Sequence, residues 1–130
     1  MGVEFFEDSA EEHRWRVADD EGVIHTCHEG FKRKHDALQN LFLNHAMMSV
    51  FVASFASGAM AVSMSEEESR IQFFAGSDDQ IWWRIKAANG EIIGKSHKGF
   101  DSRPLAVDNL IMTYTMLAMF IALHAQEQNK

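Results

Sequence analysis

The chain has 130 residues, of which 46% are apolar, and this size and composition suit one compact globular domain. Its formal net charge of −7 disfavours general binding to nucleic acid or to anionic membrane surfaces. The single cysteine, Cys27, excludes an internal disulfide, and the acidic N-terminal residues contain no apolar run typical of a secretory signal. We therefore expect a cytoplasmic protein.

The first half of the chain is predicted to form three strands, at Glu4–Glu7, His13–Ala18 and Val23–His28. Apolar and polar residues alternate in the second of them, which indicates a strand with one buried face. Trp15 lies on the face predicted to be buried, and Arg16 lies on the opposite face.

A long helix is predicted to follow, beginning near Arg33 or Lys34 and ending or kinking at Ser57-Gly58. Apolar residues form one main stripe along this helix and also lie on its other sides, which indicates a helix buried on several sides. The acidic run Glu66–Glu68 is predicted to connect this helix to the second half. The main apolar stripe consists of Leu38, Leu41, His45, Met48, Val52 and Phe55.

The second half repeats this pattern. An alternating strand covers Ile81–Ala87, and Asn89-Gly90 predicts a two-residue type I′ hairpin turn. Ile92 and Ile93 open the return strand, and a second long helix is predicted from about Pro104 to Ala125. Both helices are longer than a helix has to be in order to cover one small sheet.

An ungapped overlay of residues 3–22 on residues 71–90, extended with one single-residue gap, matches rare residue types in one order. We infer a tandem repeat of two β-β-β-α units, residues 1–65 and 66–130, which together form one α+β domain. The matched residues include Phe5 with Phe73, Trp15 with Trp83, Gly22 with Gly90, His28 with His97, Phe31 with Phe100, and Asn40 with Asn109.

The second half, from Phe73 to Ile111, resembles the YegP-like family of small tandem-repeat domains. The resemblance is carried by an F-F pair, W-R-type strand residues, N-G-x-I-I, G-F and A-x-x-N-x-I. Residues 5–41 follow the pattern less closely, because Glu21 replaces the turn asparagine and His25-Thr26-Cys27 replaces the usual return strand. The resemblance implies paired β-β-β-α units and carries no established activity.

The two units are expected to pair around a pseudo-twofold axis, with Trp15 and Trp83 in equivalent core positions. If its own sheet covers only one face of each helix, the remaining apolar faces need a partner. We therefore expect a non-catalytic module that forms a homodimer or binds another protein, with an apolar small molecule held between the helices as the alternative. The interface candidates are Met112, Met116, Met119, Phe120, Ile121, Leu123, Met47 and Phe51.

An estimate of free energy supports this interface. A large apolar side chain left in water, rather than buried, forfeits roughly 1.5–3 kcal/mol of stabilising free energy. The combined loss for several such side chains exceeds the free energy of unfolding of a typical domain. Packing of the same surface on a second copy is the simplest way to cover them. The estimate rests on Leu117, Met119, Phe120, Ile121 and Leu123.

A membrane span is the alternative explanation for the uncharged stretch Ala46–Met64, which is about long enough to cross a bilayer. A span there would place the two units on opposite sides of the membrane and prevent their pairing. Its flanks are acidic and show no positive-inside asymmetry. We expect contact with a membrane to be absent.

Seven histidines and one cysteine raise the question of a metal site or a reactive thiol. His25 and Cys27 share a strand face, and His28 is adjacent, but no second cysteine and no H-x-x-x-H or H-E-x-x-H pair accompanies them. We expect no metal and no cofactor. Cys27 as a nucleophile, with His25 or His28 as its base, is a lesser alternative.

Basic residues suggest one further candidate, an anion or ligand site. Arg16 and Arg84 occupy matched positions, and Lys95, Lys98 and Arg103 lie where the last strand meets the second helix. Solvated lysines and arginine stems packed over aromatic rings are the favoured interpretation. No carboxylate pair, triad or phosphate loop recurs at a usable spacing, so we expect no enzyme.

Overall fold

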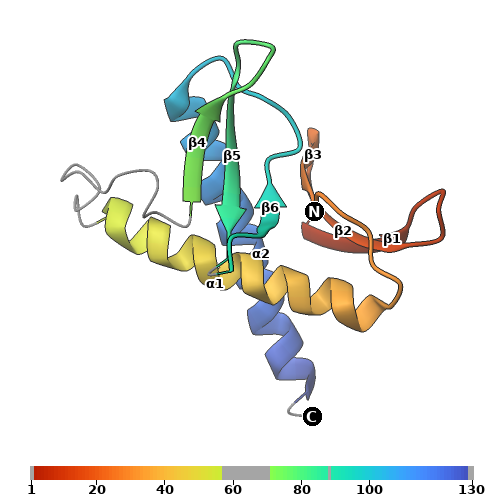
Figure 1. Ribbon diagram of the computed structural model, residues 1–130. Coiled ribbons are helices and arrows are strands. Elements are labelled where there is room, and N and C mark those ends of the chain that lie inside the picture. Colours follow the sequence, from red (N-terminus) through yellow and green to blue (C-terminus); the bar gives the residue numbers. More distant parts are fainter. Residues whose placement is uncertain (1, 57–70, 88, 129–130) are drawn as a thin grey trace.

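The computed structural model, which describes residues 2–56, 71–87 and 89–128, has an α+β fold with two three-stranded sheets and two helices (Figure 1). Three strands precede a helix, and this order occurs twice along the chain. The elements are β1 (Gly2–Glu7), β2 (His13–Asp19), β3 (Gly22–Thr26), α1 (Lys34–Ala56), β4 (Ile71–Ala75), β5 (Ile81–Lys86), β6 (Ile92–Lys95) and α2 (Arg103–Gln128).

Each sheet is an antiparallel meander with its middle strand second in sequence, in the orders β1-β2-β3 and β4-β5-β6. The two helices cross and contact each other, and each of them touches strands of both sheets. Figure 1 shows α1 running along the lower side of the two sheets, with α2 passing behind it and continuing to the C-terminus. Both sheets therefore share one core with both helices.

The core is centred on the two tryptophans that the strand pattern predicts to be buried. Trp15 and Trp83 are both 0% exposed, and the side chain of His25 lies between them. Leu41 of α1 and Leu110 of α2 are equally buried. The predicted inward direction of both tryptophans is thus confirmed.

Asn40 of α1 joins the first sheet to the second through its side-chain amide. Its Oδ1 accepts a hydrogen bond from Trp15 Nε1 at 3.0 Å, and its Nδ2 donates to the Ile93 carbonyl oxygen at 3.2 Å. Ile93 belongs to β6, so one amide ties α1 to strands of two different sheets. Such a bridge satisfies a buried indole N–H and a strand carbonyl at once.

Asn109 of α2 makes the corresponding pair of bonds. Its Oδ1 accepts from Trp83 Nε1 at 2.9 Å, and its Nδ2 donates to the Ile24 carbonyl oxygen of β3 at 2.7 Å. Sequence overlay matched the two asparagines but did not reveal that each one reaches across to the other sheet. This crossed contact appears only once the sheets are placed.

The predicted element bounds hold within a few residues, but the type I′ turn is wrong. The Gly90 N–H donates to the Ala87 carbonyl at 2.9 Å, so the turn's hydrogen bond starts at Ala87, whereas a two-residue turn at Asn89-Gly90 would start one residue later. Asn89 Oδ1 instead accepts from the Glu91 backbone N–H at 3.0 Å, and the Ala87 N–H donates to the Glu91 carbonyl at 2.8 Å. The loop is therefore longer than two residues.

Several predictions fall outside the described residues. They are the end of the first helix at Ser57-Gly58, the acidic connector Glu66–Glu68, the boundary between residues 65 and 66, and residues 57–64 of the stretch Ala46–Met64.

Candidate functional site

α2 has two apolar faces with different surroundings. One face is buried in the shared core, and another carries apolar side chains, three exposed and one half-buried, at spacings of four, three and four residues, which align along one side of a helix. Met112, Met119 and Leu123 are 49%, 58% and 59% exposed, respectively. We name this row the α2 stripe; it consists of Met112, Met116, Met119 and Leu123.

The stripe borders a groove of about 350 Å³ between α2 and the edge strand β1. Its lining is mostly apolar, and methionine side chains adapt readily to the shape of a partner. The groove is lined by Gly2 and Val3 of β1 and by Met116, Met119, Phe120 and Leu123 of α2.

The outer edge of β1 carries backbone groups that point away from its sheet. The Trp15 carbonyl accepts from the Cys27 N–H at 3.0 Å, so the backbone groups of Trp15 face β3 rather than β1. Phe5 is the β1 residue opposite Trp15, and in an antiparallel ladder its own N–H and C=O then face outward. By alternation, the N–H and C=O groups of Val3 and Glu7 also face outward, and Val3 lines the groove.

Two interface candidates, Phe120 and Phe51, and one residue of the free-energy estimate, Leu117, have little or reduced area available to a partner. Leu117 is 0% exposed, and Phe120 packs on Phe5 with ring centroids 5.7 Å apart. Phe51 is 5% exposed and packs on Phe73, so it has little area to offer a partner. The sequence estimate assumed that one sheet covers each helix, whereas α1 and α2 each touch both sheets.

The remaining candidates lie at intermediate exposure. Ile121 and Met47 are half-buried and pack against the core, as Met116 does. Among the interface candidates, the exposed apolar area is therefore concentrated on Met112, Met119 and Leu123.

α2 is also the one helix, among the described residues, that is long and apolar enough to cross a membrane. Its most apolar 18-residue window has a mean hydropathy of 1.6, and 22% of that window is buried. Length and composition of a single helix are weak grounds for a span, because core helices share them. The low burial shows instead that much of this helix lacks cover within the chain.

The candidate anion-binding residues do not form one cluster. Arg16 pairs with Glu4 at 2.9 Å and lies over the Phe6 ring, on the outer face of the first sheet. Lys98 lies over Phe100 and lines a separate groove of about 210 Å³. Arg103, the first residue of α2, lies over the Phe73 ring.

Only Arg84 and Lys95 are brought together. They are direct partners on β5 and β6, and Arg84 lies over the Phe74 ring, whereas Lys95 lies over the Trp82 ring. The packing of basic side chains over aromatic rings agrees with the favoured sequence interpretation.

His25 and Cys27 have structural surroundings rather than catalytic ones. His25 is 0% exposed, and burial, with smaller effects of His97 and His28, lowers its pKa to about 3. Burial raises the pKa of the Cys27 thiol, whose Sγ accepts from the Trp15 N–H at 3.3 Å and donates to the Glu29 carbonyl at 3.2 Å. A neutral thiol held in this way is a poor nucleophile.

Neither ring nitrogen of His25 has a hydrogen-bond partner within the described part of the chain. In the same part, no group of three or more histidine, cysteine, aspartate and glutamate side chains is placed to hold a metal ion.

No protein-family model matches the sequence, and a search of curated proteins finds no match. Solved structures do match. The solution structure of YegP from E. coli, a protein of unknown function, superposes with a TM-score of 0.62 at 18% identity, covering 90% of this chain and 87% of that one.

A UPF0339 protein from Shewanella oneidensis gives a TM-score of 0.63 at 17% identity, covering 89% of this chain and 83% of that one. At such identities the likeness concerns the fold. The resemblance seen in the strand and turn residues is confirmed at that level: the chain has the fold of YegP and of this UPF0339 protein.

Proposed function

We propose that this protein is a small non-catalytic module that self-associates through the α2 stripe. The observation that carries the proposal is the row of exposed apolar side chains on a helix whose opposite face is fully used by the core. Each such side chain forfeits roughly 1.5–3 kcal/mol when it stays in water. A second copy presents the same surface, so isologous packing covers both at once.

The edge of β1 supports a second copy as the occupant. Val3, Phe5 and Glu7 have outward N–H and C=O groups on this edge, and Val3 lines the groove that the stripe borders. An unprotected strand edge is a template for pairing with another strand. Two copies that meet at this side gain both apolar burial and backbone hydrogen bonds.

The proposal is tested by Leu123→Glu, measured by size-exclusion chromatography with light scattering. We expect the wild-type chain to elute as a dimer and the variant as a folded monomer, because a carboxylate would be buried in the interface without a partner. Ala125→Glu is the control; it puts the same charge two residues further on, nearly on the opposite side of the helix. Equal masses for wild type and Leu123→Glu would overturn the proposal.

A second candidate function is the binding of an apolar small molecule. The groove of about 350 Å³ between β1 and α2 has the size and apolar lining of a small-ligand site. Native mass spectrometry of protein purified from its own host would show a bound mass that Met119→Glu removes. A bare chain mass in every preparation would count against this function.

We also propose that the two β-β-β-α units are related by a pseudo-twofold axis as a tandem repeat. What supports this is the crossed pair of amide bridges, Asn40 to Ile93 and Asn109 to Ile24, at positions that the sequence overlay matches. In each bridge, the helix of one unit bonds to the last strand of the other.

A further inference from the structure

The two sheets differ in charge at one matched row of their outer faces. In the first sheet, Arg16 lies between Glu4 of β1 and Thr26 of β3, and the Glu4 carboxylate neutralises the Arg16 guanidinium at 2.9 Å. In the second sheet, the three matched positions are occupied by Gln72, Arg84 and Lys95. A neutral amide, Gln72, thus takes the position of the Glu4 carboxylate, and a second cation, Lys95, lies opposite Arg84.

The surrounding side chains hold both cations of the second sheet in place. Arg84 Nε donates to Gln72 Oε1 at 2.7 Å, and its guanidinium carbon lies 4.8 Å from the centre of the Phe74 ring. Lys95 Nζ lies 4.8 Å from the centre of the Trp82 ring. The aromatic faces therefore position the two charges without neutralising them.

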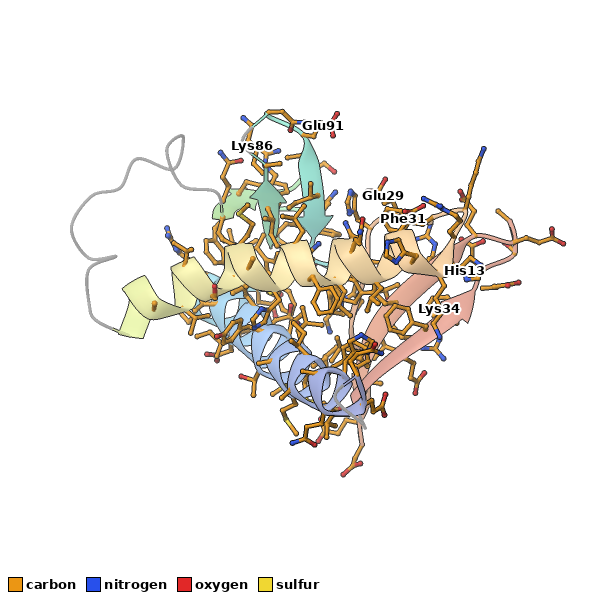
Figure 2. All side chains as sticks on the ribbon, turned by 90° about the horizontal axis from the view of Figure 1, so that it is seen from below. His13, Glu29, Phe31, Lys34, Lys86 and Glu91 are labelled. Carbon is orange, nitrogen blue, oxygen red and sulfur yellow. The ribbon has the colours of Figure 1, made fainter. Side chains whose placement is uncertain are left out.

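Neither cation forms an ion pair with a carboxylate of the described residues. Asp78 Oδ1 is turned towards the Trp82 indole N–H, at 3.2 Å. Glu91 lies at the turn end of the β5–β6 hairpin, as Lys86 does (Figure 2). It is four residues from Lys95, or roughly 13 Å along an extended strand.

Like charges directly opposite each other on neighbouring strands destabilise a sheet. An anion bound between Arg84 and Lys95 would remove that repulsion, and a guanidinium with a nearby ammonium suits a tetrahedral oxyanion. A phosphate monoester carries a charge of about −1.5 to −2 at neutral pH, which matches these two cations.

We propose that the outer face of the second sheet binds a phosphate monoester between Arg84 and Lys95. The ester belongs either to a small metabolite or to a phosphorylated side chain of another protein, since both present the same group. The overall charge of −7 disfavours long polyanions without opposing a local contact with one phosphate. This site does not depend on self-association through α2.

The experiment is a titration of ¹⁵N-labelled protein followed by NMR at constant ionic strength and pH 7.5. Inorganic phosphate probes the shared chemistry, and AMP and a phosphoserine peptide distinguish the two sources. We expect shifts confined to Arg84, Lys95 and the Trp82 indole N–H, with a Kd on the order of 1 mM for inorganic phosphate. Whichever of AMP and the peptide binds more tightly identifies the source.

The decisive variant is Gln72→Glu, which gives the second sheet the carboxylate that the first sheet already has. Gln72 is 8% exposed, so the new carboxylate should pair with Arg84, to which Gln72 already bonds, and weaken phosphate binding at least tenfold. Lys95→Thr should weaken binding by a similar factor, whereas Glu4→Gln on the first sheet should leave it unchanged. Absence of shifts in the wild type, or equal binding by Gln72→Glu, would overturn the proposal.

Discussion

His25 is the residue whose surroundings set the acid sensitivity of the fold. Its ring lies between two tryptophan rings, with centroids 5.2 Å from Trp15 and 5.0 Å from Trp83. His97 approaches it edge-on at 6.3 Å, and no acidic group contributes to its pKa. A charge at this point would be both buried and unpaired, so the ring stays neutral in the folded chain.

Stability should therefore fall as the solution is acidified. The pKa of His25 is about 3 when folded, below the ordinary value of 6.5, so between these values the unfolded chain binds more protons. The contribution is complete above pH 6.5 and decreases by about 1.4 kcal/mol for each pH unit below it. Urea unfolding at pH 7.5 and pH 5.0 should differ by about 2 kcal/mol from this group.

The matched control is His25→Leu, which places an apolar side chain of similar size, without a titratable group, at the same position. The variant should lose most of this difference between pH 7.5 and pH 5.0, although His97 and His45, whose pKa values burial also lowers, would leave a smaller slope. An unchanged pH dependence in His25→Leu would show that other groups govern acid unfolding.

Asn44 and Gly94 illustrate what single residues hide from sequence reading. A β-carbon at Gly94 would overlap the Asn44 side-chain oxygen, so the glycine makes room for the amide of a helix far away in sequence. Asn44 Nδ2 donates to the Asn40 carbonyl at 2.8 Å and to the Ile93 carbonyl at 3.1 Å. In sequence, Gly94 looks like an ordinary strand glycine.

At the scale of elements, α1 and α2 hold the two sheets together through buried amides. Asn40→Ala and Asn109→Ala should each destabilise the chain by roughly 2 kcal/mol, because each leaves a tryptophan indole N–H without its partner and removes one helix-to-sheet hydrogen bond. The Ile93 carbonyl keeps its hydrogen bond from Asn44 Nδ2 when Asn40 is replaced. Gln39→Ala, an exposed change on α1, should stay within about 0.5 kcal/mol of wild type.

Thermal or urea unfolding of these three variants measures the comparison. Similar losses at Asn40 and Asn109 are what a pseudo-twofold arrangement predicts. A large loss at one position and none at the other would contradict the equivalence of the two units.

The strands and helices could be predicted because their periodic patterns are local. Alternation in β2 and β5 identified the buried tryptophans, and the row of residues along α2 identified the exposed stripe. The groove beside β1 and the bridges from Asn40 and Asn109 could not be predicted, because they join elements whose placement no local pattern encodes. For the same reason, Phe120 and Phe51 were assigned to an interface, and Leu117 was counted in the free-energy estimate. Each helix in fact touches both sheets, which helps to cover these side chains.

At the scale of the whole molecule, one chain buries its tryptophan core completely and leaves one side of α2 uncovered. Met112, Met119 and Leu123 on that side are each about half exposed or more. The chain superposes on its structural neighbours with TM-scores of 0.62 and 0.63 although the sequences are only 18% and 17% identical. The core does not explain why apolar side chains are exposed on this side of α2, and we propose self-association as the reason.

Sedimentation velocity of the wild-type chain from 1 µM to about 500 µM tests that account most directly, since a range this wide brackets typical dissociation constants of small dimers. We predict that the wild-type chain sediments as a dimer at the upper end of this range, whereas Met119→Glu/Leu123→Glu stays a monomer and Ala125→Glu keeps the dimer. A wild-type chain that sediments as a monomer over the whole range would contradict the account.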